Sequence, residues 1–189
     1  VQDKAVGDRL RKYEYAEQSR NLSNELDRET VEMVIGQCVD NYELVARYYR
    51  TKRDILGLDK LTHYDRYAPL FEAQQMYSFD EAKDVVLSSF GKFSEELKDV
   101  ANEFFEKNWI DAEPRKGKRG GAFCMYVCPE IHPYVLVNYL NKQDDIMTLG
   151  HELGHGAHAY LARCQKYVNQ STALPVAELA STFGEMLVF

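Results

Sequence analysis

Apolar residues recur at helical spacing along the first half of the chain, and this pattern predicts helices. An interrupted apolar stripe runs from Asp3 to Arg20, and a polar break follows at 21–24. Asp27 should then cap a long helix that reaches about Leu56, where Gly57 ends it. Helical spacing favours core packing of its apolar side over a ligand platform built from its tyrosines. That side comprises Val31, Val34, Ile35, Cys38, Tyr42, Val45, Tyr48 and Tyr49.

Two shorter helices are expected after a loop at 58–76. Ser78 and Glu81 have the spacing of a capping box, and the helix that they begin should end at Gly91. Ser94 can start the next helix. The first half of the chain is therefore expected to be helical throughout.

The pattern then changes to two short strands at 122–128 and 134–139, joined by a proline-containing loop. Such a hairpin has an edge strand that can pair with an extended peptide through main-chain hydrogen bonds. It can equally serve only to cover neighbouring helices, and the spacing alone leaves both interpretations open.

The sequence from His151 to His155 is HExxH. Helix positions i and i+4 lie one turn apart on the same face, so both imidazoles can bind a single metal ion. Zinc takes ligands of this kind and keeps one position open for water when it is catalytic. Glu152 is then placed to accept a proton from that water rather than to bind the metal.

The same helix contains Gly150, Gly154 and Gly156. Each glycine costs about 1 kcal/mol against alanine inside a helix. The cost is explained if a second helix or a strand packs closely against this backbone. The alternative is a core helix with hydrogen-bonded histidines and incidental glycines, although an adjacent glutamate is hard to place in an apolar core.

A third ligand is available in the segment 174–185, which predicts a further helix with Pro175 in its first turn. Glu178 follows His151 by 27 residues, which is enough for a helix, a loop and a return. Glu178 and Glu185 share one face, which suggests a metal-binding carboxylate and a second one that orients an imidazole. For Glu185 a solvated helix face is the alternative.

The segments 151–162 (HELGHGAHAYLA) and 173–185 (ALPVAELASTFGE) closely resemble the oligoendopeptidase F branch of the thimet-oligopeptidase-like zinc metallopeptidases. The resemblance extends upstream through 117–123, 132–134 and Asp144, and 58–70 is similar to the segment that leads into the family's catalytic lobe. It implies a mainly α fold, a helical zincin-type catalytic domain fragment with a small antiparallel β-hairpin beside the HExxH helix.

This resemblance also implies site roles. His151, His155 and Glu178 would bind one Zn²⁺ ion, and Glu152 would act as general base on a zinc-bound water. The chain would then be a zinc-dependent endopeptidase that hydrolyses peptide bonds in short oligopeptides. Further candidates for orienting a ligand or contacting substrate are His158, Glu185, Ala122, Phe123, His132 and Tyr134.

His158 lies on the same side of its helix as the two HExxH histidines. From spacing alone it can compete for metal, contact substrate or hydrogen-bond within the site. In the family that the chain resembles the third ligand is glutamate, which argues against ligation by His158. The metzincin pattern HExxHxxGxxH fails, because His158 and Leu161 stand where it needs glycine and histidine.

A single partial catalytic domain is expected over 1–189, with a helical wall at 1–110 and the hairpin and both ligand helices at 111–189. The family's N-terminal lobe and the C-terminal remainder of its domain are expected to be absent. The alternative is a zinc-binding helical fragment, catalytically weak or inactive, that acts as a structural or partner-binding module.

Charge and composition limit the partners. The net charge of −7 argues against a nucleic-acid partner, because phosphate binding needs a basic surface. No apolar run approaches the length of a membrane span. The four cysteines lack the paired spacing of a zinc knuckle, so they are expected to be reduced, as in a cytoplasmic protein. The one basic stretch, 115–121, is expected to be an exposed flexible loop or a loop that closes over bound peptide.

Overall fold

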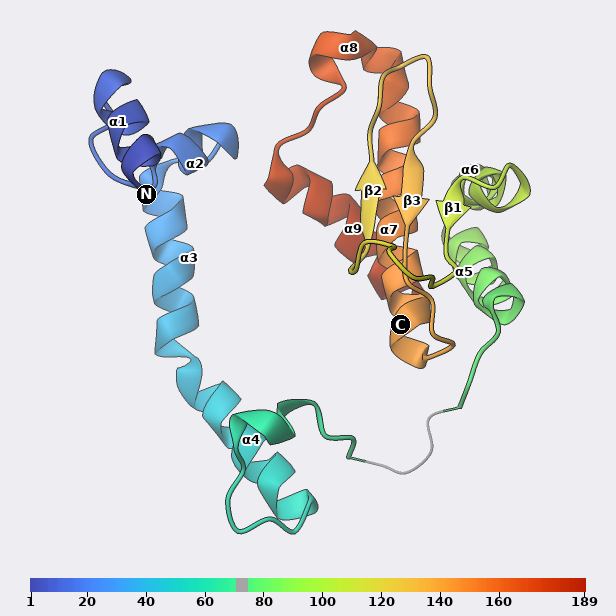
Figure 1. The fold of residues 1–189 in the computed structure, drawn as a ribbon, viewed down its shortest axis with the longest axis horizontal. Helices are drawn as coiled ribbons and strands as arrows, with labels where there is room; N and C mark the ends of the chain where they lie inside the picture. Colours follow the sequence, from blue (N-terminus) through green and yellow to red (C-terminus); the bar gives the residue numbers. More distant parts are fainter. Residues whose placement is uncertain (71–74) are drawn as a thin grey trace. The chain divides into compact units, whose positions relative to one another are not determined.

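The computed structural model of the chain describes residues 1–70 and 75–189. It divides into two compact units, Val1–Ala73 and Gln74–Phe189. Both are mainly helical, and the second contains a small sheet beside the HExxH helix, which confirms the expected fold class (Figure 1). That 1–189 acts as one partial catalytic domain stays a prediction.

The described residues of the first unit form four α-helices and one 3₁₀ helix. They are α1 (Gln2–Leu10), α2 (Gln18–Ser23), α3 (Arg28–Asp40), α4 (Tyr42–Ile55) and η1 (His63–Tyr67). The helical stripe expected from 3 to 20 is thus interrupted between α1 and α2. The break in the helix expected at 21–24 is wrong, because α2 extends to Ser23. Of the loop expected at 58–76, positions 71–74 lie outside the described residues.

The long helix expected from Asp27 begins and ends as the sequence indicates. The Asp27 carboxylate accepts a hydrogen bond from the backbone N–H of Thr30 at 2.6 Å, and Gly57 adopts a positive φ of 65° just after α4. The expected continuity is wrong at Asn41. Its side chain donates to the carbonyl of Gln37 at 2.7 Å, and this competing bond accompanies a non-helical backbone between α3 and α4.

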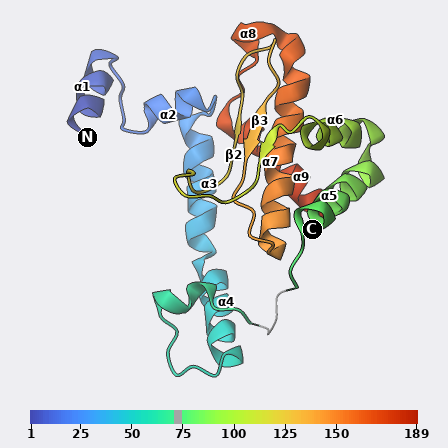
Figure 2. The ribbon, with the colours of Figure 1, turned by 45° about the vertical axis from the view of Figure 1, so that its right-hand side comes forward.

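The apolar side of α3 and α4 does not form the core that its spacing predicts. Figures 1 and 2 show the two helices following one another end to end, so neither covers the other. Within residues 1–70, the segment 61–66 lies beside Val45 and Tyr49, but most of this side stays exposed. Its exposed members are Val34, Ile35, Cys38, Tyr42, Val45 and Tyr48.

The second unit begins with α5 (Phe79–Phe93) and α6 (Glu95–Glu106). The capping box at the start of α5 is confirmed, because Ser78 N–H donates to Glu81 Oε2 at 2.7 Å and Glu81 N–H donates back to Ser78 Oγ at 3.2 Å. The helix was expected to run to Phe90 and to be ended by Gly91, which is wrong because α5 continues to Phe93. The helix instead stops where Ser94 becomes extended and caps α6.

The sheet has three short strands, β1 (Ile110–Asp111), β2 (Phe123–Met125) and β3 (Tyr134–Leu136), in the order β1–β3–β2. β2 and β3 are antiparallel and pair Cys124 with Val135, which confirms the hairpin with shorter strands than expected. β1 was not predicted and runs parallel to β3. Both β1 and β2 are edge strands of the described sheet.

The sheet and four helices enclose the core of the second unit. The remaining elements are α7 (Gln143–Ala162), η2 (Arg163–Gln165), α8 (Lys166–Asn169) and α9 (Leu174–Val188). Both views show the strands lying against α7 (Figures 1 and 2), and α5, α6 and α9 contact its other sides. The largest fully buried apolar side chains are Phe90, Phe104, Leu149, Leu153, Val86, Val135 and Val137.

Two expectations from composition can be compared with the described residues. None of the described helices is both long enough and apolar enough to cross a membrane. All four cysteines are free thiols, in keeping with the reduced state expected for them.

Candidate metal centre

Three potential metal ligands converge between α7 and α9. His151 and His155 lie one turn apart on α7, and their ring centroids are 5.0 Å apart. Glu178 reaches them from α9, with its Oε2 atom 3.4 Å from Nε2 of His151 and 3.5 Å from Nε2 of His155. The three donor atoms lie within 4.8 Å of one another, and no other such group of three occurs among the described residues. Two imidazoles and one carboxylate are a donor set that suits zinc.

The close packing of α7 on α9 brings these ligands together. A Cβ atom added at Gly154 would lie 2.5 Å from the carbonyl oxygen of Ala180, and one at Gly184 would lie 2.6 Å from the carbonyl oxygen of Gly150. Only glycine permits helix backbones to approach this closely. At Gly156 the added atom would meet the ring of Phe104 at 2.8 Å, so the third glycine accommodates α6. The close approach expected from the glycines is therefore present on two sides of α7.

Neighbouring side chains on α9 contact two of these potential ligands. Glu185 Oε2 lies 3.1 Å from Nδ1 of His151. An imidazole that donates from Nδ1 to a carboxylate presents its Nε2 lone pair on the other side, toward Glu178. The hydroxyl of Ser181 donates to Glu178 Oε2 at 2.8 Å. Glu185 therefore lies where the sequence places a group that orients an imidazole.

Glu152 lines the same cleft as these three residues but is not part of the converging group. Its side chain is buried, and its Oε2 atom has no hydrogen-bond partner among the described residues. Burial raises the pKa of Glu152 to about 7; His151 opposes this shift and the charge of Glu178 adds to it. Burial also lowers the pKa of His155, which favours the neutral imidazole that binds metals. The site thus combines an imidazole that favours its neutral form, that of His155, with a carboxyl group that can exchange a proton near neutral pH.

A cleft of about 490 Å³ opens over these groups. Its walls are the β2 segment, α7 and the start of α9 with the loop before it. The lining residues are Ala122, Phe123, Cys124, Tyr126, His151, Glu152, His155, Ser171, Thr172, Leu174, Ala177 and Glu178. A second cavity, of about 550 Å³, also reaches His151 and Glu152 and is lined in addition by Asp144, Met147, Thr148, Glu185 and Phe189.

The remaining candidates divide between this cleft and other places. Ala122 and Phe123 line the cleft. His132 lies elsewhere, since its ring stacks on Trp109 at 3.8 Å with an interplanar angle of 8°. Tyr134 is half-exposed on β3 and does not line the cleft. These placements favour a substrate role for Ala122 and Phe123 over His132 and Tyr134.

His158 lines a different cavity from its two neighbours on α7. That cavity, of about 370 Å³, is mainly apolar and lies between α7, α9 and the α5–α6 pair. The Nδ1 atom of His158 is buried and has no hydrogen-bond partner among the described residues. Glu178 Oε2 is close to His151 and His155 but not to His158, so the geometry gives His158 no part in the converging group.

Two cleft residues on β2 and just after it escaped the sequence analysis. Cys124 and Tyr126 alternate with Phe123 and Met125, a strand pattern that would have placed them on one face. The Tyr126 hydroxyl is buried without a hydrogen-bond partner among the described residues. Burial raises the pKa of Cys124 and of Tyr126 to about 12, with the charge of Glu152 adding to both. Both groups therefore keep their protons at neutral pH.

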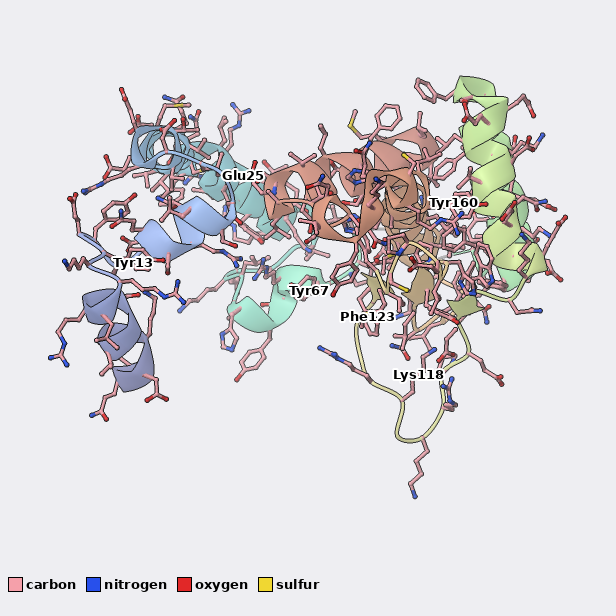
Figure 3. The ribbon with its side chains drawn as sticks, turned by 90° about the horizontal axis from the view of Figure 1, so that it is seen from above. Tyr13, Glu25, Tyr67, Lys118, Phe123 and Tyr160 are labelled. Carbon is pink, nitrogen blue, oxygen red and sulfur yellow. The ribbon has the colours of Figure 1, made fainter. Side chains whose placement is uncertain are left out.

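The basic loop at 115–121, expected to be either an exposed flexible loop or a loop that closes over bound peptide, is exposed at every position except Lys118 and is held at its base. The side chain of Lys118 is only 2% exposed, and its Nζ donates to the carbonyl oxygens of Val137 at 2.7 Å and Asp111 at 2.9 Å. The guanidinium of Arg115 donates two hydrogen bonds to the Asp111 carboxylate, at 2.6 and 2.7 Å. Figure 3 labels Lys118 on this loop and Phe123 on the β2 segment that follows it. Closure of the loop over a peptide stays a prediction.

Known proteins resemble the chain over almost its whole length. The model of peptidase family M3 matches residues 2–189. Oligopeptidase PepF of Bacillus subtilis is 32% identical over 182 residues, which cover 95% of this chain and 27% of that protein. Group B oligopeptidase PepB of Streptococcus agalactiae is 33% identical over 187 residues, which cover 95% of this chain and 30% of that protein. This chain therefore spans less than a third of the length of these relatives.

Solved structures agree with the sequence relatives. A crystal structure from Chlamydophila abortus, assigned as a peptidase, superimposes with a TM-score of 0.77 at 29% identity and covers 99% of this chain and 31% of its own. A structure of PZ peptidase A with an inhibitor gives a TM-score of 0.67 at 23% identity, covering 76% of this chain and 27% of its own. Because the identity to PZ peptidase A is only 23%, this second similarity supports the fold alone.

Proposed function

Because the chain belongs to peptidase family M3, we propose that it carries the metal centre of a zinc-dependent endopeptidase that hydrolyses peptide bonds in short oligopeptides. The observation that supports this most is the convergence of His151, His155 and Glu178 beside a buried Glu152 with an unpartnered oxygen. The relatives named oligopeptidases support the substrate class. A cytoplasmic location, in keeping with the four free thiols, is part of the same proposal.

His151 and His155 would hold the ion through Nε2, and Glu178 would hold it through Oε2. A bound zinc ion supplies Lewis acidity, which polarises the scissile carbonyl and acidifies water. A single carboxylate among the three ligands leaves the site a net positive charge, which favours the negative charge that develops on the carbonyl oxygen. Glu185 would hold His151 in the tautomer that leaves Nε2 free, and Ser181 would hold the Glu178 carboxylate.

Glu152 would perform the proton transfer. Glu152 lines the cleft, and its raised pKa suits a group that takes a proton from the attacking water and passes it to the leaving amine. A carboxylate with the ordinary pKa would be a weaker base for this step. The negative charge of the neighbouring Glu178 helps to raise the pKa of Glu152 above its ordinary value.

The peptide would lie along β2. This strand is an edge of the described sheet, and its residues Phe123 and Cys124 line the cleft that holds the three ligand side chains. An extended peptide that pairs with an edge strand is bound through its main chain, so recognition depends little on side chains. That mode fits an enzyme that cleaves many short peptides.

The replacement of Glu152 by glutamine tests the proposal. Glu152→Gln should bind one zinc ion per chain as the parent does, but it should not cleave a quenched fluorogenic peptide. A chelator should abolish cleavage by the parent, and added zinc should restore it. The exposed Glu130→Gln is the matched control and should behave as the parent does in both measurements.

The outcomes separate the possibilities. Parent-like turnover by Glu152→Gln would refute the assignment of the base. Zinc binding by a parent that cleaves no peptide would favour the alternative of a catalytically inactive, zinc-binding helical module. Loss of zinc from His155→Ala, measured by metal analysis after dialysis, would support the proposed ligand set.

A further inference from the structure

Tyr126 is one of the residues that line the proposed catalytic cleft. It follows directly after β2 and lines the cleft together with Cys124, His151, Glu152 and Glu178. Its hydroxyl is buried and has no hydrogen-bond partner among the described residues. A buried hydroxyl without a partner is unfavourable, so such a group is uncommon unless something else supplies the acceptor.

Other tyrosines of the same unit show the usual arrangement. The hydroxyl of Tyr139 donates to the carbonyl oxygen of Tyr77 at 2.9 Å, and that of Tyr160 donates to Glu103 Oε2 at 3.1 Å. In both cases the hydroxyl is bonded within the fold and therefore contributes to its stability. The hydroxyl of Tyr126 makes no such contribution, which separates it from a purely structural tyrosine.

The surroundings of the Tyr126 hydroxyl indicate what it binds. Tyr126 lines the same cleft as Glu178 and Glu152, and their negative charges add to the effect of burial on its pKa, so the phenol lies near the ligand group and the proposed base. A phenol O–H donates readily to a carbonyl oxygen. The main chain of a peptide that lies along β2 brings carbonyl oxygens into this part of the cleft.

We propose that Tyr126 is a substrate-binding residue whose hydroxyl donates a hydrogen bond to a main-chain carbonyl oxygen of the bound peptide. This inference rests on the proposed peptidase function and adds a residue that the HExxH pattern does not contain. Because the contact is with the peptide backbone, it holds the peptide in the cleft without selecting a side chain.

Tyr126→Phe removes the hydroxyl and little else. In a zinc-loaded Glu152→Gln background, which prevents turnover, the added Tyr126→Phe change should weaken binding of a fluorescein-labelled mixed-sequence octapeptide by about 3- to 10-fold, the range of one hydrogen bond. In the active parent background, KM for a fluorogenic peptide should rise by a similar factor while kcat changes by less than about 2-fold. Zinc content should not change.

Thermal melting distinguishes a substrate-binding hydroxyl from a structural one. Peptide-free Tyr126→Phe should melt at or above the temperature of the parent, because it loses a buried hydroxyl that had no partner. Tyr139→Phe is the matched control, since it loses a hydroxyl bonded within the fold. It should melt below the parent and bind peptide with unchanged affinity.

Each contrary outcome has a definite meaning. Unchanged peptide affinity in Tyr126→Phe would overturn the inference while leaving the peptidase proposal intact. A lower melting temperature, or failure to fold, would show that the hydroxyl has a structural partner and would overturn it as well. Failure of the zinc-loaded Glu152→Gln chain itself to bind peptide would contradict the proposed function and this inference together.

Discussion

Replacement of Gly154 by alanine tests whether the close packing of two helices positions the proposed metal ligands. Gly154 lies between the two HExxH histidines, where α9 approaches the backbone of α7. A Cβ atom there would lie 2.5 Å from the carbonyl oxygen of Ala180 and 2.9 Å from Cα of Ser181. Both contacts are with backbone atoms, so no change of rotamer relieves them. To reach an ordinary contact of 3.4 Å, α9 must move away from α7 by about 0.9 Å.

This displacement matters because Glu178 lies on α9, three residues before Ser181. Metal sites tolerate errors of only about 0.2 Å in ligand distance. We therefore expect Gly154→Ala to weaken zinc binding by about tenfold or more, measured by competition with a chromophoric chelator. The overpacking should also lower the free energy of unfolding by about 1–3 kcal/mol. The melting temperature should fall by about 2–4 °C for each kcal/mol of lost stability.

Gly36→Ala provides the matched control. Gly36 also lies inside a helix, but a Cβ atom added there would meet nothing within 4 Å. This change should be neutral or stabilise its unit by about 0.5–1 kcal/mol, because alanine favours the helix. If Gly154→Ala melts at the same temperature as the parent and binds zinc with unchanged affinity, the reasoning from close packing is refuted.

Further predictions concern the groups around the ligands. Glu185→Gln should retain zinc but weaken its binding by about 10- to 100-fold in a chelator competition, because His151 loses a charged partner; unchanged affinity would contradict this. Burial raises the pKa of Glu152 from 4.5 to about 7. The folded metal-free chain therefore holds the proton of the Glu152 carboxyl more tightly than the unfolded chain does. The free energy of unfolding should accordingly fall as the pH rises from about 4.5 to about 7. Glu152→Gln should lack this component, so its melting temperature should rise relative to the parent between about pH 5 and about pH 8; a constant difference would count against the buried carboxyl. Lys118→Met should lower stability by about 1–3 kcal/mol and speed tryptic cleavage of the basic loop, because four oxygen acceptors lose their donor; Lys116→Met, on the exposed part of the loop, should have neither effect.

The local features of the site could be predicted from the sequence. The i, i+4 spacing of His151 and His155 determines which face of α7 they share, and a regular helix cannot change that relation. Gly150 and Gly154 indicated a close neighbour, because their cost in a helix needs an explanation. The position of Glu178 in a new helix was also readable, but its convergence with the imidazoles is a tertiary relation that spacing can only allow.

The features that the sequence did not reveal depend on contacts between distant segments. β1 has only two residues and is defined by parallel pairing with β3, so no periodicity marks it. The break at Asn41 depends on a side-chain hydrogen bond that competes with the helix. The importance of Tyr126 follows from the burial and lack of a partner at one oxygen atom, which no pattern of apolar and polar residues encodes.

The zinc environment itself offers the most direct test of the metal centre. X-ray absorption at the zinc edge, on the chain loaded with one equivalent of zinc, should show nitrogen and oxygen ligands at about 2.0–2.2 Å, with outer scattering from two imidazole rings. In Glu178→Gln and His155→Ala this signature should be altered or lost. A sulfur shell at about 2.3 Å, which would indicate a cysteine ligand, or a chain that takes up no zinc, would contradict the proposed centre.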